Sequence, residues 1–128
     1  GTLGSSAFST LSWLGETYVS NSSMHSTGTN PSRLIPQTTG VYRFETQIQR
    51  SSAAAANLFQ PTFLDSSGNI VGMASLIQTT AIQAVYAACY KRFDAVGGYV
   101  VVDLRSDGAS TQSLSSGFDR TWFSMGKL

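Results

Sequence analysis

The residue types that could support catalysis begin with a single histidine, His25, which stands in the serine-rich segment Ser22-Ser23-Met24-His25-Ser26. Histidine and serine are components of nucleophilic acyl transfer, but that chemistry also requires a carboxylate that orients the imidazole ring. The chain has no G-x-S-x-G segment, which carries the nucleophile in α/β-hydrolases. We therefore expect His25 to lie in a solvated polar loop, where it is available to contact a partner.

Residues that could bind a metal ion are few. One histidine and one cysteine, Cys89, are too few for a zinc site within one chain. Asp103, Asp107 and Asp119 are the alternative, because carboxylates gathered near one end of a domain can bind Ca²⁺. The segment 65–69 resembles part of a calcium-binding loop, but it lacks the length and the closing glutamate, so we interpret it as a turn. The sequence predicts no cofactor and no metal site.

The remaining catalytic candidates are carboxylates and the thiol. The acidic residues are spread singly, and Glu16 with Glu45 is the only pairing to consider for the acid and base of a glycoside hydrolase. Cys89 lies in a run of small and apolar residues, which is typical of a buried, unreactive cysteine. The prediction is that the protein is not an enzyme.

Charged residues make up only 12% of the 128-residue chain, about half the usual fraction, and the net charge is +1. Such a balance excludes a protein that binds nucleic acid through many phosphate contacts. No apolar run reaches the roughly 20 residues of a membrane-spanning helix. A folded domain with so little charge needs either a surface rich in serine and threonine or a surface covered by other chains. The segment 70–90 contains no charged residue at all.

Short segments in which apolar and polar residues alternate recur along the chain and predict β-strands. In the clearest, 41–49, one face holds Tyr42, Phe44, Thr46 and Ile48. Further strands are predicted at 11–19, 33–35, 58–64, 70–77, 81–90, 99–104 and 118–126, with loops at 21–30, 53–56 and 106–117. Pro61 favours an edge position or a bulge, and Gly68 favours a hairpin turn. The fold class predicted is all-β, an antiparallel sandwich or jelly roll of about 8–10 strands.

The segment 81–90 is apolar on both faces. Ala84, Tyr86, Ala88 and Tyr90 alternate with Val85, Ala87 and Cys89. Only one face of a strand meets the core of a small sandwich, so the second face needs another cover. We expect a neighbouring subunit to supply it.

Three segments, in order, resemble the C1q/TNF-like jelly-roll family. Arg33-Leu34-Ile35-Pro36 followed by Gly40-Val41-Tyr42-Arg43-Phe44 is similar to the family's strand, proline-containing turn and G-x-Y-x-F strand. Residues 95–102 are similar to its Gly-Asp-x-Val strand, although the aspartate is absent. The segment 121–128 resembles its closing Ser-x-Phe-x-Gly-x-x-Leu strand.

The resemblance covers the chain from about residue 11 and implies a trimer-forming jelly roll. It divides the chain into an N-terminal arm, 1–10, and a single jelly-roll domain, 11–128. Members with this low-charge composition include phage virion proteins such as head decoration subunits, head fibres and tail-fibre knobs. No Gly-X-Y stalk repeat is present, which favours a subunit that docks on a larger particle.

We therefore expect a non-enzymatic virion surface protein, a homotrimer that binds capsid, tail or fibre proteins and contacts the host surface. Aromatic residues anchor such contacts, and the predicted trimer interface consists of Tyr86, Tyr90, Tyr99, Trp122, Ala84 and Ala88. A second group, predicted to contact a ligand or partner, consists of His25, Lys91, Arg92 and Phe93.

The alternative is a secreted carbohydrate-binding module or lectin-like sandwich. Exposed aromatic rings stack on sugars, and Phe93, next to a predicted turn, is the strongest candidate for such a ring. Glycan binding and self-association both use exposed aromatic residues, so the sequence leaves both functions open.

Overall fold

The computed structural model describes residues 2–3, 7–13, 24–26, 28–49, 57–74, 77–79, 84–106, 112–113 and 121–128. Throughout these ranges the regular structure is β-strand, which confirms the predicted all-β class. The strands are β1 (Thr2–Leu3), β2 (Ala7–Thr10), β3 (Gly40–Gln49), β4 (Asn57–Asp65), β5 (Ile70–Met73), β6 (Ile77–Thr79), β7 (Ala84–Phe93), β8 (Val100–Ser106), β9 (Gln112–Ser113) and β10 (Trp122–Lys127). The described residues contain no helix long and apolar enough to cross a membrane.

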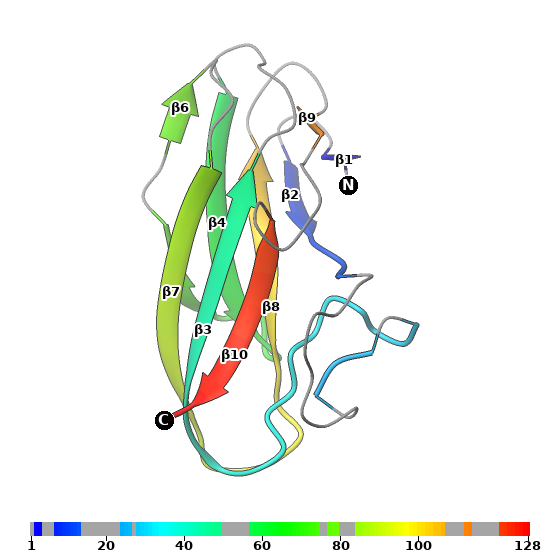
Figure 1. The fold of residues 1–128 in the computed structure, drawn as a ribbon, viewed down its shortest axis with the longest axis vertical. Helices are drawn as coiled ribbons and strands as arrows, with labels where there is room; N and C mark the ends of the chain where they lie inside the picture. Colours follow the sequence, from blue (N-terminus) through cyan, green and yellow to red (C-terminus); the bar gives the residue numbers. More distant parts are fainter. Residues whose placement is uncertain are drawn as a thin grey trace.

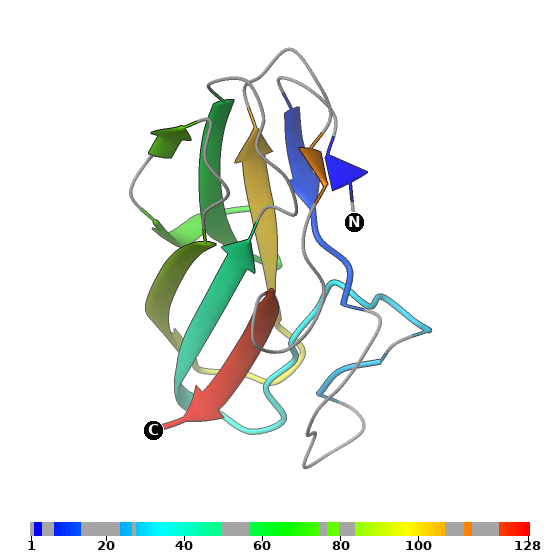
Figure 2. The ribbon, with the colours of Figure 1, turned by 45° about the horizontal axis from the view of Figure 1, so that its top comes forward.

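Two antiparallel sheets pack face to face (Figures 1 and 2). One has the order β10-β3-β7. The other has the order β2-β8-β4-β5, and β6 also pairs with β4. A small pair, β1 with β9, lies near the N-terminus (Figure 1). The chain is therefore an antiparallel β-sandwich, and the two sheets leave two outer faces on which side chains can gather.

Strand β3 shows why these sequences form a sandwich. Its burial alternates along the strand, with Tyr42, Phe44, Thr46 and Ile48 buried and their neighbours partly exposed, as predicted. Thr46 is the polar member of the buried set, and its Oγ1 donates a hydrogen bond of 2.8 Å to the Trp122 carbonyl oxygen. That bond satisfies a buried hydroxyl that would otherwise destabilise the core.

Aromatic rings fill the space between the sheets. The Phe44 ring lies between those of Phe93 and Phe123, at centroid distances of 6.1 and 6.2 Å. From the opposite sheet, Phe63 reaches Phe123 at 6.0 Å. Side chains of β7 and β8 complete the core, namely Val85, Ala87, Cys89, Val100, Val102 and Leu104.

The hairpin β4–β5 was predicted, and its turn has the expected geometry. Gly68 has a φ of +81°, which a residue with a side chain rarely adopts. The Asp65 carboxylate accepts hydrogen bonds from the backbone N–H groups of Ser67 and Asn69, at 2.9 and 3.0 Å. This arrangement, an aspartate that caps its own turn, makes segment 65–69 a turn rather than a cation loop.

Of the two positions expected for Pro61, an edge strand or a bulge, the edge strand is wrong, because β4 lies inside its sheet. The Pro61 carbonyl accepts a hydrogen bond from Ala74 N (3.0 Å), so its nitrogen faces the same side. On that side β4 pairs with β5 and with β6, and the regular pairing is interrupted between these two strands. The missing N–H therefore costs no ladder bond.

The N-terminal segments also differ from the predicted boundaries. Residues 7–10, assigned to the arm, form strand β2 and pair with β8. Residues 11–13 continue past the strand, and 14–19, the rest of the predicted strand 11–19, lie outside the described residues. Residues 33–35 contribute a single bridge, Leu34 with Val100. The predicted loop 53–56 and most of 106–117 also lie outside the described residues, apart from 106 and β9.

Candidate functional site

Five of the six residues predicted at the trimer interface lie on the outer face of the sheet β10-β3-β7. Ala84, Tyr86, Ala88 and Tyr90 follow one another at alternate positions of β7, and the register places Tyr86 and Trp122 on either side of Gln47. Alternation makes this the face opposite the core. We call it the tyrosine face, and it consists of Arg43, Glu45, Ala84, Tyr86, Ala88, Tyr90 and Trp122.

The centre of the tyrosine face is a hydrogen-bonded group from β3 and β7. Tyr86 Oη donates to Glu45 Oε2 at 2.5 Å and accepts from Arg43 Nη2 at 3.1 Å. Arg43 Nε lies 3.4 Å from Glu45 Oε1, so the two charges neutralise each other within the face. Residue type and alternation predict Tyr86 as a contact residue but not its two β3 partners, which the strand register brings opposite β7.

Aromatic rings extend this group in both directions along the face. The rings of Tyr86 and Trp122 are 6.2 Å apart between centroids, and the Arg43 guanidinium lies 5.8 Å from the centre of the Tyr90 ring. Tyr86 and Tyr90 are 49% and 58% exposed. Large exposed rings with locally paired charges are suited to contact with another surface, because little charge must be stripped of water.

The hydrogen bond to Glu45 raises the pKa of the Tyr86 phenol above its ordinary value of 10.0, because the carboxylate stabilises the protonated hydroxyl. The same phenol strengthens the charged state of Arg43, whose pKa is also raised. The phenol therefore remains protonated at neutral pH and is not poised as a nucleophile or a base. The chemistry of the tyrosine face is therefore suited to contact rather than to proton transfer.

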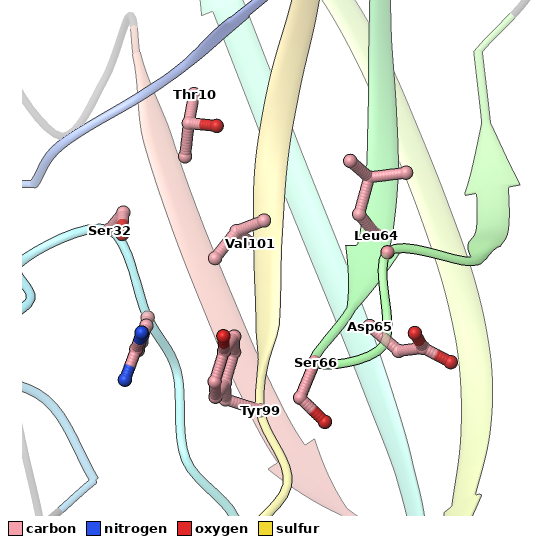
Figure 3. Close-up of a pocket in the computed structure, with 9 residues that line it drawn as sticks. Thr10, Ser32, Leu64, Asp65, Ser66, Tyr99 and Val101 are labelled. Carbon is pink, nitrogen blue, oxygen red and sulfur yellow. The ribbon is translucent and has the colours of Figure 1, made fainter.

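The sixth predicted interface residue, Tyr99, lies elsewhere. It precedes β8 on the outer side of the other sheet, where the Arg33 guanidinium stacks 4.0 Å from the centre of its ring. Both residues line a depression of about 320 Å³. Figure 3 shows Tyr99 and other residues of this lining. We call it the Arg33 pocket, and its lining residues are Thr10, Ser32, Arg33, Leu64, Asp65, Ser66, Gly68, Tyr99 and Val101.

The second predicted group, His25, Lys91, Arg92 and Phe93, is not one surface. Phe93 is buried, 6% exposed, and packs edge-on against Tyr42 with centroids 5.8 Å apart, so its ring is not available to stack on a sugar. Lys91 pairs with Asp65 at 3.6 Å, and Arg92 is exposed on β7. Strand alternation sends adjacent residues to opposite faces, which is why neighbours in sequence separate here.

His25 is buried, only 5% exposed, in place of the solvated position expected from its polar neighbours. Its Nε2 is 2.8 Å from the Pro31 carbonyl oxygen, and the chain around it is closed by a bond from Ile35 N to the Met24 carbonyl oxygen at 2.9 Å. His25 thus stabilises the loop that carries Arg33 to its pocket. Its neighbouring serines give no hint of this contact.

The predicted calcium alternative cannot be assembled from the described residues. They hold no group of three or more His, Cys, Asp or Glu side chains placed to bind a metal ion. Asp103 accepts a hydrogen bond from Thr10 Oγ1, and Asp107 and Asp119 lie outside the described residues. Cys89 is buried with its thiol free, and burial raises its pKa to about 11. Such a thiol is protonated and poorly reactive at neutral pH.

Comparison of the sequence with protein-family models and with curated proteins finds no match. The resemblance to C1q/TNF-like jelly rolls therefore stays a prediction made on three segments of sequence.

Proposed function

We propose that this protein is a non-enzymatic structural subunit of a virion surface, a homotrimer whose copies meet through the tyrosine face. In this proposal the trimer docks on a larger particle, as a capsid decoration or a fibre head, and contacts the host surface. The stoichiometry and the virion setting rest on the resemblance to C1q/TNF-like phage domains. The antiparallel β-sandwich supports the fold part of that resemblance.

The observation that carries the proposal is the exposure of the tyrosine face. Strand β7 has a buried face in the core and an outer face that also holds alanines and tyrosines, with Tyr86 and Tyr90 about half exposed. Aromatic residues next to small ones form the centre of many protein interfaces, because rings fit into the space above a small side chain. A second copy of the chain supplies rings of the same kind.

The contacts of three reactive groups support the non-enzymatic part of the proposal. The His25 ring bonds a backbone carbonyl, the Tyr86 phenol donates to a carboxylate, and the Cys89 thiol is buried and protonated. Each of these contacts stabilises the fold or a surface.

Sedimentation analysis at micromolar concentration tests the self-association. We expect the wild-type chain to sediment as a trimer and the Ala88→Arg variant as a monomer, because a long charged side chain would stand in the middle of the tyrosine face. Ala95→Arg is the matched control, since Ala95 is exposed in the β7–β8 connection. A wild-type chain that sediments only as a monomer overturns the proposal.

The second candidate function, glycan binding, draws on the same rings. A sugar stacks on an exposed aromatic face, and Tyr90 is the most exposed aromatic ring whose exposure the structure describes. Under this alternative the protein is a lectin-like module, secreted or on a virion, and saturable binding to a glycan array disappears in Tyr90→Ala. The variant Ala88→Arg also distinguishes the two functions. If the protein is a trimer, this variant is monomeric whether or not a glycan is present.

A further inference from the structure

The Arg33 pocket is built on a short backbone bridge. Leu34 and Val100 exchange two hydrogen bonds, from Leu34 N at 3.0 Å and from Val100 N at 3.1 Å. Leu34 packs against the core and Val100 is fully buried. Their neighbours Arg33, Tyr99 and Val101 therefore point to the opposite side, onto the outer face of the sheet β2-β8-β4-β5. This face is distinct from the tyrosine face, which belongs to the other sheet.

Arg33 is held in place by an aromatic ring, and no described residue neutralises its charge. One face of its guanidinium is covered by the Tyr99 ring at 4.0 Å, a cation–π contact that leaves the N–H edges free to donate. No carboxylate among the described residues forms an ion pair with Arg33. A guanidinium fixed in one plane is suited to bidentate binding of a carboxylate.

The one carboxylate in the pocket lining, Asp65, does not compete for Arg33. It accepts the two turn N–H bonds and pairs with Lys91, and these contacts lower the pKa of Asp65. Figure 3 shows its carboxylate directed away from Tyr99 and Val101. The positive charge of Arg33 is therefore not paired with Asp65 or with any other described carboxylate.

The rest of the lining combines hydroxyl groups with a small apolar floor. Ser32 and Ser66 supply hydroxyls around the depression, and Leu64 and Val101 lie side by side on paired strands beneath it (Figure 3). The depression has a volume of about 320 Å³ and is open to solvent on one side. Polyhydroxylated rings need this combination, because a sugar has hydroxyls at its rim and C–H groups on its faces.

We propose that the Arg33 pocket binds a carboxylated sugar residue, a uronic or sialic acid unit of a glycan. Arg33 holds the carboxylate, the serine hydroxyls and the Tyr99 Oη hydrogen-bond the ring substituents, and Leu64 with Val101 contacts the C–H face. The site does not depend on self-association, because it lies on the other sheet.

The test is a titration followed by amide chemical-shift changes, with D-glucuronate and N-acetylneuraminate as probes and D-glucose and acetate as controls. At least one acidic sugar should bind saturably and shift residues of the pocket, with an affinity at least about tenfold above D-glucose, the size expected from a charge-assisted hydrogen-bond pair. It should also bind more tightly than acetate, because the sugar ring adds contacts to those of the carboxylate. If acetate and the acidic sugars bind equally well, the pocket recognises only the carboxylate and not the sugar ring, and the proposal is overturned. Equal binding of D-glucose would overturn the role of the carboxylate.

Variants separate the specific role of the Arg33 side chain from the effect of the protein's net charge. Arg33→Gln should weaken the acidic sugar at least about tenfold, whereas Arg92→Gln, an equal change of charge on the other sheet, should leave it unaltered. Arg33→Lys keeps the charge but not the planar fork, so it should restore only part of the affinity. Thermal unfolding of each variant tests whether a loss of sugar binding comes from a loss of folded protein. Binding unchanged in Arg33→Gln sinks the proposal, while a monomer that still binds the sugar refutes only the trimer.

Discussion

At the scale of single residues, the surroundings of His25, Tyr86 and Cys89 decide how each side chain behaves. The Tyr86 phenol between Glu45 and Arg43 is the clearest case, because the two charges act on its proton in opposite directions. The carboxylate contact is the larger influence and raises the pKa. A group whose folded pKa is raised stabilises the fold fully below its ordinary pKa and loses that contribution as pH rises through the folded value.

Alkaline titration checks this assignment. The absorbance change of Tyr86, obtained as the difference between the wild type and Tyr86→Phe, should occur above pH 10.0, the ordinary value for a tyrosine. In Glu45→Gln the same change should move to lower pH, because an amide accepts the phenol proton less strongly and carries no charge. A titration of Tyr86 that Glu45→Gln leaves in place contradicts the hydrogen bond as the cause.

At the scale of elements, turns and close strand approaches set the geometry of both faces. The turn 65–69 joins β4 to β5 and also forms one wall of the Arg33 pocket. Its backbone depends on the charged form of Asp65, whose pKa is lowered chiefly by the Asn69 N–H. The carboxylate therefore stabilises the fold above the ordinary pKa of 3.8, and this contribution is lost as pH falls through the folded value.

Asp65→Ala should lower the free energy of unfolding by about 1–2 kcal/mol at pH 7, because two backbone N–H groups and Lys91 lose their acceptor. The matched control is Asp94→Ala, since Asp94 is exposed in the β7–β8 connection. Urea unfolding across a pH series measures both. The deficit of Asp65→Ala should shrink below about pH 4, and a deficit that stays constant down to pH 2 would contradict the ionic origin.

The second element-scale feature is the contact of β5 with β7. A Cβ atom at Gly72 would lie 2.5 Å from the Cys89 Cβ, and both backbones are held by their sheets. Gly72→Ala should cost about 1–3 kcal/mol of unfolding free energy, the usual penalty of overpacking. Gly126→Ala, in β10, places its methyl group where nothing lies within 4 Å and should be near neutral. Equal urea midpoints for the two variants would refute the close approach.

At the scale of the whole molecule, the sandwich separates two surfaces by a single core. The tyrosine face lies on one sheet and the Arg33 pocket on the other, so self-association and ligand binding need not compete. The proposed functions depend on the two sheets remaining packed, and Cys89, buried between them, reports on that packing.

Thiol labelling with a disulfide reagent measures whether the sheets open. With a pKa of about 11, only about one thiol in a thousand is ionised at pH 8, and the sulfur is also covered. Native protein should therefore label slowly, and labelling should accelerate steeply through the urea unfolding transition. Fast labelling of the native protein, independent of urea, would show that the core around Cys89 is accessible.

Much of the sandwich follows from local pattern. The alternation in 41–49 predicts which side chains of β3 are buried, and Gly68 predicts the turn, because both depend on residues close in sequence. The burial of Phe93 and His25 was not predictable in this way. Phe93 belongs to a strand that continues past its expected end at residue 90, and His25 is buried by a loop that closes on itself.

By itself, the sequence determined the all-β class, most of the strands and the side chains that share a face within each strand, because alternation is a local property of the extended chain. Only the tertiary structure decided which strands are neighbours. That pairing places Glu45 and Arg43 beside Tyr86, and it stacks Arg33 on Tyr99. It also turns the Pro61 nitrogen, which has no hydrogen to donate, toward a side where β4 has no regular strand partner at this position. Such contacts depend on the register between segments that are far apart in the chain. Burial of the shared core selects that register, because a shift by one residue would expose the apolar side chains.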